Sequence, residues 1–94
     1  MLLGNRLITT GDTRRYEVDY ADFLQTGDVI ASATVSENGP TSQTGSAVLD
    51  VSQTKFFFFL TAGVVGEAFT VSLQIKTVFG EIVNHTINFQ VVPA

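Results

Sequence analysis

The sequence predicts a small antiparallel β-sandwich of about seven strands. Apolar and polar side chains alternate in several short segments, which is the period of a strand that buries one face. Glycine, proline, asparagine and aspartate separate these segments at short intervals, as in all-β domains. Because no segment longer than a single turn shows a helical period, two packed sheets are the architecture that this pattern favours.

The first thirteen residues are predicted to be an N-terminal arm, and residues 14–94 to be the β-sandwich domain itself. The arm is interrupted by Gly4, Gly11 and Asp12, and its side chains establish no period. A short strand over residues 7–9 is the only regular element expected before the domain begins.

The first half of the domain predicts three strands and one helical turn. Residues 15–20 alternate apolar with charged side chains, and residues 29–35 are rich in β-branched and small side chains. Between these strands, Asp19 is expected to cap a single helical turn, which Gly27 closes in a left-handed conformation. Residues 46–52 alternate again and predict a third strand, which follows a polar loop.

The second half of the domain contains the most regular pattern. Residues 69–77 and 83–91 alternate closely and flank a tight turn at residues 79–81, so they predict an antiparallel hairpin. Pro93 has no backbone donor and ends the second of these strands. The preceding strand, residues 55–60, differs because four consecutive phenylalanines place aromatic side chains on both of its faces.

Composition argues against several classes of function. A net charge of −4 with only five basic residues is unfavourable for binding nucleic acid, which requires clustered lysine and arginine. The chain has no cysteine, so it has no disulfide and no cysteine-based metal or redox site. Its N-terminus lacks the apolar run of a signal peptide or membrane span. We therefore expect an unprocessed, soluble protein that binds neither nucleic acid nor membrane.

No constellation of side chains predicts catalysis or metal binding. His85 is the only histidine, shares a face with apolar residues and is expected to be a satisfied buried or boundary residue. Asp19, Asp22 and Asp28 could supply oxygen ligands to calcium, but they lack EF-hand spacing, and capping explains Asp19 more simply. Neither the paired carboxylates of a glycosidase nor a phosphate-binding loop is recognisable. The sequence thus predicts no enzyme, no cofactor and no metal.

Three segments resemble a family of small immunoglobulin-like domains encoded by tailed bacteriophages. Tyr-Glu-Val-Asp-Tyr-Ala-Asp-Phe-Leu at residues 16–24 and Gly-Asp-Val-Ile at residues 27–30 resemble the family's Val-Asp-Trp-Ser-x-x-Leu and Gly-Asp-x-Ile. Residues 60–71 are similar to its Leu-Ser-Gly-Gly-Thr-Ala-Gly-x-x-Tyr-x-Val, and residues 77–81 to its Thr-x-x-Gly-Arg hairpin. The resemblance implies an immunoglobulin-like β-sandwich.

The chain departs from the family pattern at four places. Tyr20 stands where the family has tryptophan, Ala62 where it has the first glycine, and Glu81 where it has a basic residue. The strand before residues 60–71 normally alternates, whereas here it contains four phenylalanines. Because the matching segments are turns that determine the fold, the resemblance specifies architecture more closely than role. It implies a virion component without catalytic residues, synthesised in the host cytoplasm.

The phenylalanine strand has two interpretations. Either both of its faces are buried within the domain, or the outward pair of rings contacts another chain. Aligning Leu60 with the inward leucine of the family places Phe56 and Phe58 inside. Phe57 and Phe59 then point outward, where each ring left in water would forgo about 1.5–3 kcal/mol of burial. We therefore favour an interface with another chain.

These observations predict a non-enzymatic virion structural protein, most simply a capsid decoration or cement protein or a head-fibre component. The expected partners are the major capsid protein or fibre and neck subunits, together with further copies of the chain, by analogy in a trimer. The predicted interface combines the outward rings with the apolar arm, namely Leu2, Leu3, Leu7, Ile8, Phe57 and Phe59. The alternative is a receptor- or glycan-binding module of a tail fibre or baseplate, although the loops at residues 36–45 and 61–68 carry no aromatic side chain.

Overall fold

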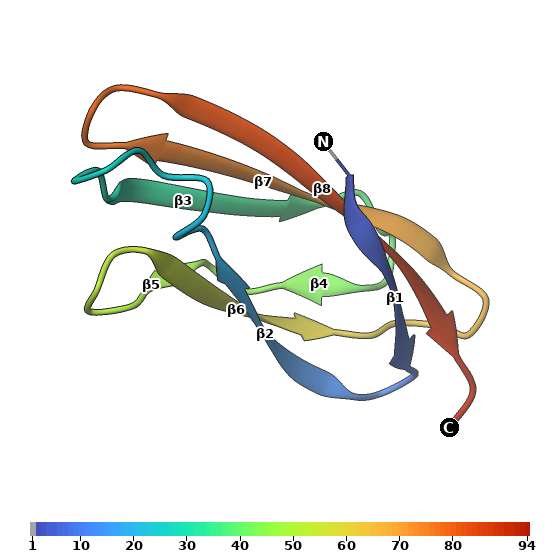
Figure 1. Cartoon of the computed structure of the whole chain (residues 1–94). Coiled ribbons are helices and arrows are strands. Elements are labelled where there is room, and N and C mark those ends of the chain that lie inside the picture. Colours follow the sequence, from blue (N-terminus) through green and yellow to red (C-terminus); the bar gives the residue numbers. More distant parts are fainter. Residues whose placement is uncertain (1) are drawn as a thin grey trace.

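The computed structural model describes residues 2–94, which form eight strands in two packed sheets and no helix (Figure 1). Sheet A has the strand order β1-β8-β7-β3, and sheet B has the order β2-β6-β4, with β5 also paired to β6. The strands are β1 (Leu2–Thr9), β2 (Thr13–Asp19), β3 (Ile30–Glu37), β4 (Gln43–Thr44), β5 (Val48–Leu49), β6 (Lys55–Thr61), β7 (Ala68–Thr77) and β8 (Ile82–Val92). The predicted all-β sandwich is confirmed. None of the described residues belongs to a helix long and apolar enough to cross a membrane.

Antiparallel pairing dominates both sheets, and β7 and β8 form the hairpin that the sequence predicts. The exception is β1, which runs parallel to β8. Strand β3 lies in sheet A while β2 and β4 lie in sheet B, so the chain crosses between the two sheets before and after β3. The molecule measures 43 × 23 × 18 Å, and its connecting loops gather at the two ends of the long axis (Figure 1).

The N-terminal segment differs from the predicted free arm. Its residues form β1, which pairs with β8 from Leu2 to Thr9, so the edge of sheet A begins almost at the start of the chain. Ile8 is buried in the core, and Leu3 packs against it. The register shifts between Leu2 and Gly4. This irregularity breaks the period of two, which explains why alternation alone did not predict the strand.

The core fills the space between the two sheets. It is built from alternate residues of β6, β7 and β8, together with single residues from β1, from β3 and from the connections after β2 and after β6. Its buried hydrophobic members are Ile8, Tyr20, Ile30, Phe56, Phe58, Leu60, Ala62, Phe69, Val71, Leu73, Ile75, Ile87, Phe89 and Val91. The strands with the clearest alternation therefore supply most of the core.

The strand predicted at residues 46–52 is much shorter than expected. Only Val48 and Leu49 pair with β6, because the chain turns immediately afterwards. Asp50 Oδ2 accepts hydrogen bonds from the backbone and hydroxyl of Ser52, and the carbonyl of Asp50 accepts one from the Gln53 amide. These local bonds offer the backbone an alternative to the sheet and end the strand.

Two carboxylates fasten the loops at opposite ends of the sandwich. Near one end, Glu67 accepts hydrogen bonds from the amides of Thr41 and Ser42 and from the Thr41 hydroxyl. These bonds lower the pKa of Glu67, the Thr41 hydroxyl having the largest effect. At the other end, Asp28 Oδ1 accepts hydrogen bonds from the amides of Val29 and Phe79, at 2.8 and 3.1 Å. Each carboxylate thus ties together loops that are distant in sequence.

Candidate functional site

The phenylalanine strand β6 separates its four rings between the two faces of sheet B. Phe56 and Phe58 have no exposed surface and lie in the core. Phe57 is partly buried, and Phe59 keeps 48% of its surface exposed. The orientation predicted for these side chains is therefore confirmed. Whether the outward rings contact another protein remains a prediction.

The outward rings form the centre of a small apolar patch on sheet B. Phe57 and Phe59 meet edge to face with ring centroids 6.0 Å apart, a favourable geometry for aromatic pairs. Val48 lies opposite Phe57 in the pairing of β5 with β6, and it is also about half exposed. We call Val48, Phe57 and Phe59 the sheet B patch.

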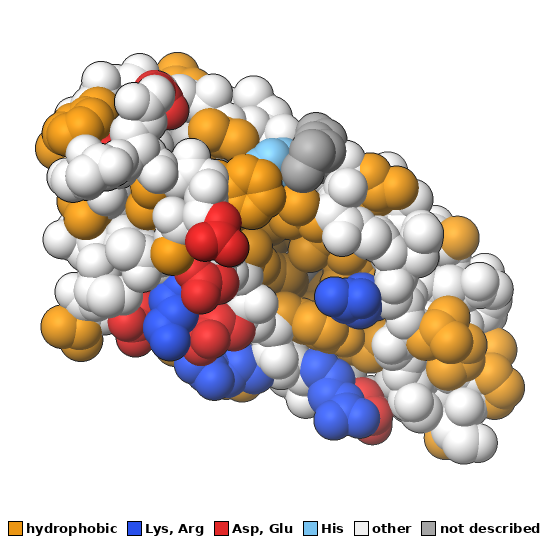
Figure 2. Space-filling view, in the orientation of Figure 1, with side chains coloured by type: hydrophobic (Ala, Val, Ile, Leu, Met, Phe, Trp, Pro, Cys, Tyr) orange, Lys and Arg blue, Asp and Glu red, His pale blue; other side chains and the backbone are white. Residues whose placement is uncertain are grey.

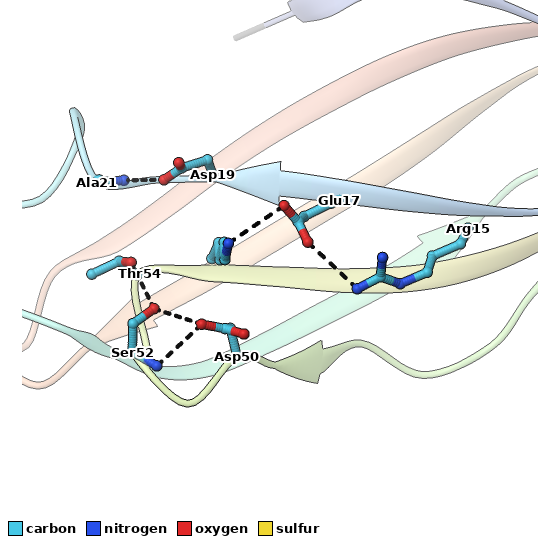
Figure 3. A network of polar contacts seen from close by, with 8 residues as sticks. Arg15, Glu17, Asp19, Ala21, Asp50, Ser52 and Thr54 are labelled. Atoms are coloured by element: carbon cyan, nitrogen blue, oxygen red, sulfur yellow. Dashed lines mark hydrogen bonds and ion pairs between the residues drawn. The ribbon is translucent and has the colours of Figure 1, made fainter.

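Charged side chains border this patch on the side of β2. The guanidinium carbon of Arg15 lies 4.2 Å from the centre of the Phe57 ring, within the range of a cation–π interaction. Glu17 forms ion pairs with Arg15 at 3.4 Å and with Lys55 at 3.7 Å (Figure 3). All three charged side chains are exposed by a third or more, so these pairs contribute little to stability. The result is a surface with one ring covered by a cation and the other open.

The N-terminal residues of the predicted interface lie elsewhere. Ile8 is buried, and Leu3 packs against the core, so both mainly stabilise the sandwich. Leu2 and Leu7 are exposed, at 49% and 69%, but they belong to β1 in sheet A. The structure thus does not join the six predicted residues into one surface. Pairing with β8 fixes β1 in sheet A, where Ile8 enters the core, so this segment is not a free arm.

His85 is buried, as the sequence predicts, and it has a specific partner. Its Nδ1 shares a 2.5 Å hydrogen bond with the Tyr20 hydroxyl, and the two rings stack with centroids 5.3 Å apart. Burial lowers the pKa of His85 and raises that of Tyr20 to about 12. Both groups are therefore neutral at pH 7, and the pair has the character of a structural element of the core.

The three aspartates considered as calcium ligands have separate surroundings. Asp19 Oδ1 accepts a hydrogen bond from the amide of Ala21 at 2.9 Å, at a turn that stands in place of the predicted helical turn. Asp22 is exposed, whereas Asp28 is buried and bound to backbone amides. Within residues 2–94, no group of three or more histidine, cysteine, aspartate or glutamate side chains is arranged to hold a metal ion.

A second surface feature is a hollow of about 500 Å³ on sheet A, beside β1, β7 and β8. A chain of hydrogen bonds crosses three strands at this hollow. Thr70 Oγ1 donates to Asn88 Oδ1 at 3.1 Å, and Asn88 Nδ2 donates to Asn5 Oδ1 at 3.2 Å. Sequence inspection did not reveal this row, because its members come from strands that are paired only in the folded chain.

A third feature escaped the sequence analysis as well. Two exposed aromatic side chains lie on loops, Phe23 after β2 and Phe79 in the β7–β8 turn. The loops that the sequence analysis considered, residues 36–45 and 61–68, are different ones. The available signal was the position of Phe79 within a predicted tight turn, where a large apolar side chain has little opportunity for burial.

Comparison with known proteins gives a match to a family model and a match to a solved structure. Residues 9–90 match the family model described as "Podophage GP4 fiber-tail adaptor protein gp77". The solution structure of Amebosin resembles the chain with a TM-score of 0.45 and 14% sequence identity, over 96% of this chain and 95% of that one. No curated protein sequence matches the chain.

Proposed function

Because the chain belongs to the family of podophage GP4 fiber-tail adaptor protein gp77, we propose that it connects proteins at the junction of the phage tail and its fibres. Membership makes it a phage structural protein and a component of the virion. The proposed role is non-enzymatic and depends on contacts with other virion proteins. Capsid decoration or a head fibre, the role predicted from the sequence, is the competing location.

The observation that carries a connector role is the sheet B patch. Phe59 is half exposed beside Phe57 and Val48, and an exposed apolar cluster of this kind is characteristic of protein interfaces. Arg15 and Glu17 border the cluster and supply the polar rim that interfaces have. The patch is small, so it would form only part of a full contact surface.

The location is tested by reconstructing the phage particle that encodes the chain. Density for the sandwich at the tail–fibre junction is the expected result. Density spread over the capsid shell would instead support decoration, and a particle that lacks the protein altogether would refute a virion role. Separately produced fibre, tail and capsid proteins, mixed with the chain in pairs, then identify the direct partner.

The role of the sheet B patch is tested with Phe57→Ser/Phe59→Ser. This variant should fold but bind its virion partner at least about tenfold more weakly, as expected for central apolar contacts. Val64→Ser/Val65→Ser is a matched control, because it also removes two exposed apolar side chains but lies in the β6–β7 connection. Equal binding by the phenylalanine variant and the native chain would exclude the patch as the interface.

A receptor- or glycan-binding role is the second candidate, and the hollow on sheet A is the observation that favours it. Its volume of about 500 Å³ lies in the range of small-ligand sites, and amide and hydroxyl groups line it. Asn5, Thr70 and Asn88 could exchange hydrogen bonds with a neutral sugar. Binding of a neutral oligosaccharide on a glycan array, lost in Asn88→Ala, would support this role.

A further inference from the structure

Five large apolar side chains are exposed on three loops or at their margins. The three loops lie at the same end of the sandwich (Figure 1). We call this the loop end and define it as residues 19–29, 50–54 and 76–82. Its exposed apolar residues are Phe23 at 48%, Val51 at 99%, Val78 at 60%, Phe79 at 59% and Ile82 at 59%. Hydrophobic side chains are visible at the end of the molecule that holds the β7–β8 turn (Figure 2).

Hydrogen bonds hold these loops together. Two hydrogen bonds join the β5–β6 turn to the two ends of the β2–β3 connection. The Tyr20 amide donates to the Thr54 carbonyl, and the Ile30 amide at the start of β3 donates to the Gln53 carbonyl, both at 2.8 Å. The β7–β8 turn is tied to the same connection by Asp28, whose buried carboxylate accepts the Phe79 amide. The apolar side chains therefore stand on a backbone that is already fixed, which lowers the entropic cost of binding.

A further side-chain bond and a ring contact strengthen this arrangement. Gln25 Nε2 donates to Glu81 Oε1 at 2.8 Å, across the two loops. The Phe79 ring lies over Gly27, where a Cβ atom would come within 3.9 Å of the ring. A contact at this distance is ordinary van der Waals packing and does not require glycine. The φ of 83° at Gly27 does favour glycine, so the turn depends on this residue.

The loop end also holds the net charge of the molecule. It contains five of the nine acidic residues of the chain and one of the five basic residues, Lys76. These numbers account for the whole formal charge of −4 and leave the remainder of the chain balanced. The acidic residues are Asp19, Asp22, Asp28, Asp50 and Glu81. Asp28 is buried, so the other four acidic side chains are the ones that a partner can reach. An apolar tip with acidic side chains is complementary to an apolar surface that also carries lysine or arginine.

We infer that the loop end is a second docking surface of the proposed connector, and that it binds a protein segment that combines apolar with basic side chains. This inference rests on the proposed function, since a connector needs one surface for each protein that it joins. The sheet B patch lies on an outer sheet face between β2 and β5, whereas the loop end lies at one end of the long axis. The two surfaces can therefore face different partners.

Other occupants fit the loop end less well. Two copies of the chain in contact through this end would bring like charges together, which is unfavourable at an interface. An anionic membrane surface would likewise repel the acidic side chains. A basic protein surface is the occupant that satisfies both the apolar and the charged groups.

The test uses the purified full-length chain and a display library of random peptides. Selected peptides should combine lysine or arginine with leucine or aromatic residues. Raising the salt concentration should lower their affinity for the chain. Val78→Ser/Phe79→Ser should reduce binding at least about tenfold. Asp22→Asn/Glu81→Gln should reduce it by about two- to fivefold at low salt and have little effect at high salt.

Val64→Ser/Val65→Ser is again the control and should bind the selected peptides like the native chain. Thermal unfolding checks that every variant folds. The inference is overturned if no peptide is selected, if the selected peptides are acidic or neutral, or if Val78→Ser/Phe79→Ser binds them unchanged. If the chain is found at the tail–fibre junction but the peptide test is negative, the proposed function stands and only the loop-end surface is refuted. A chain absent from the virion would lose the proposed function, whatever the peptides show.

Discussion

The inner and outer faces of β6 carry the same side chain in different surroundings. On the inner face, Phe58 stacks on Tyr16 with ring centroids 5.8 Å apart and has no exposed surface. On the outer face, Phe59 contacts Phe57 and is half exposed. The comparison teaches that one run of phenylalanines can serve two purposes. The inner rings stabilise the fold, and the outer rings are available to a partner.

The largest effect that tests this division is the loss of an inner ring. Phe58→Ala should lower the free energy of unfolding by about 3–5 kcal/mol, because it removes buried apolar surface and leaves a cavity. Phe59→Ala should lower it by less than about 1 kcal/mol, since that ring is already half exposed. Urea unfolding of both variants measures the difference. Similar losses in the two variants would contradict the division.

An intermediate effect is expected at the polar pair inside the core. Tyr20→Phe keeps the ring but removes the hydroxyl that bonds to His85 Nδ1. The buried Nδ1 of His85 loses this hydrogen-bond partner in the variant. The loss should lower the free energy of unfolding by about 1–3 kcal/mol. Denaturant unfolding at pH 7.5 tests this expectation. An unchanged free energy of unfolding would show that this hydrogen bond does not stabilise the fold.

The same pair should make stability depend on pH. Burial lowers the pKa of His85 below its ordinary value of 6.5, so the unfolded chain binds a proton more readily than the folded chain. Stability from this residue is fully present above pH 6.5 and is lost as the pH falls below that value toward the lowered pKa. The melting temperature should therefore decrease between pH 7 and pH 5.

The two carboxylates whose pKa values are lowered do not interfere in this window. The pKa of Asp50 is lowered, with the Ser52 hydroxyl as its main cause, and that of Glu67 is lowered chiefly by the Thr41 hydroxyl. Their contributions are lost only in stronger acid. His85→Gln, which does not titrate, should show a flatter melting profile from pH 7 to pH 5. A slope equal to that of the native chain would assign the effect to other groups.

The smallest effect concerns the cover on the outer face. Arg15→Ala removes the guanidinium from the Phe57 ring, and an exposed cation–π contact is worth about 0.5–1 kcal/mol. Calorimetric unfolding at low salt measures this loss. Arg14→Ala is the matched control, because it likewise removes an exposed arginine in an ion pair, here with Asp12 at 3.8 Å. A loss above about 2 kcal/mol would mean that the outer face stabilises the fold more than this comparison allows.

Sequence reasoning was most successful where a strand has one buried face. The alternation in β7 and β8 predicted the hairpin, and the alignment of Leu60 predicted which rings of β6 point inward. It was least successful at β1, where the bulge between Leu2 and Gly4 hides the period. It also overestimated the length of β5, because Asp50 and Ser52 form a local turn that competes with the sheet.

By itself, the sequence determined the all-β class, the hairpin and the two faces of the phenylalanine strand. These are local properties, since the period of two fixes which side chains share a face. Only the tertiary structure decided that β1 pairs with β8, and that Asp28 binds the turn holding Phe79. Contacts between segments far apart in the chain leave no period in the sequence. The outward phenylalanines were therefore predictable, whereas the loop end was not.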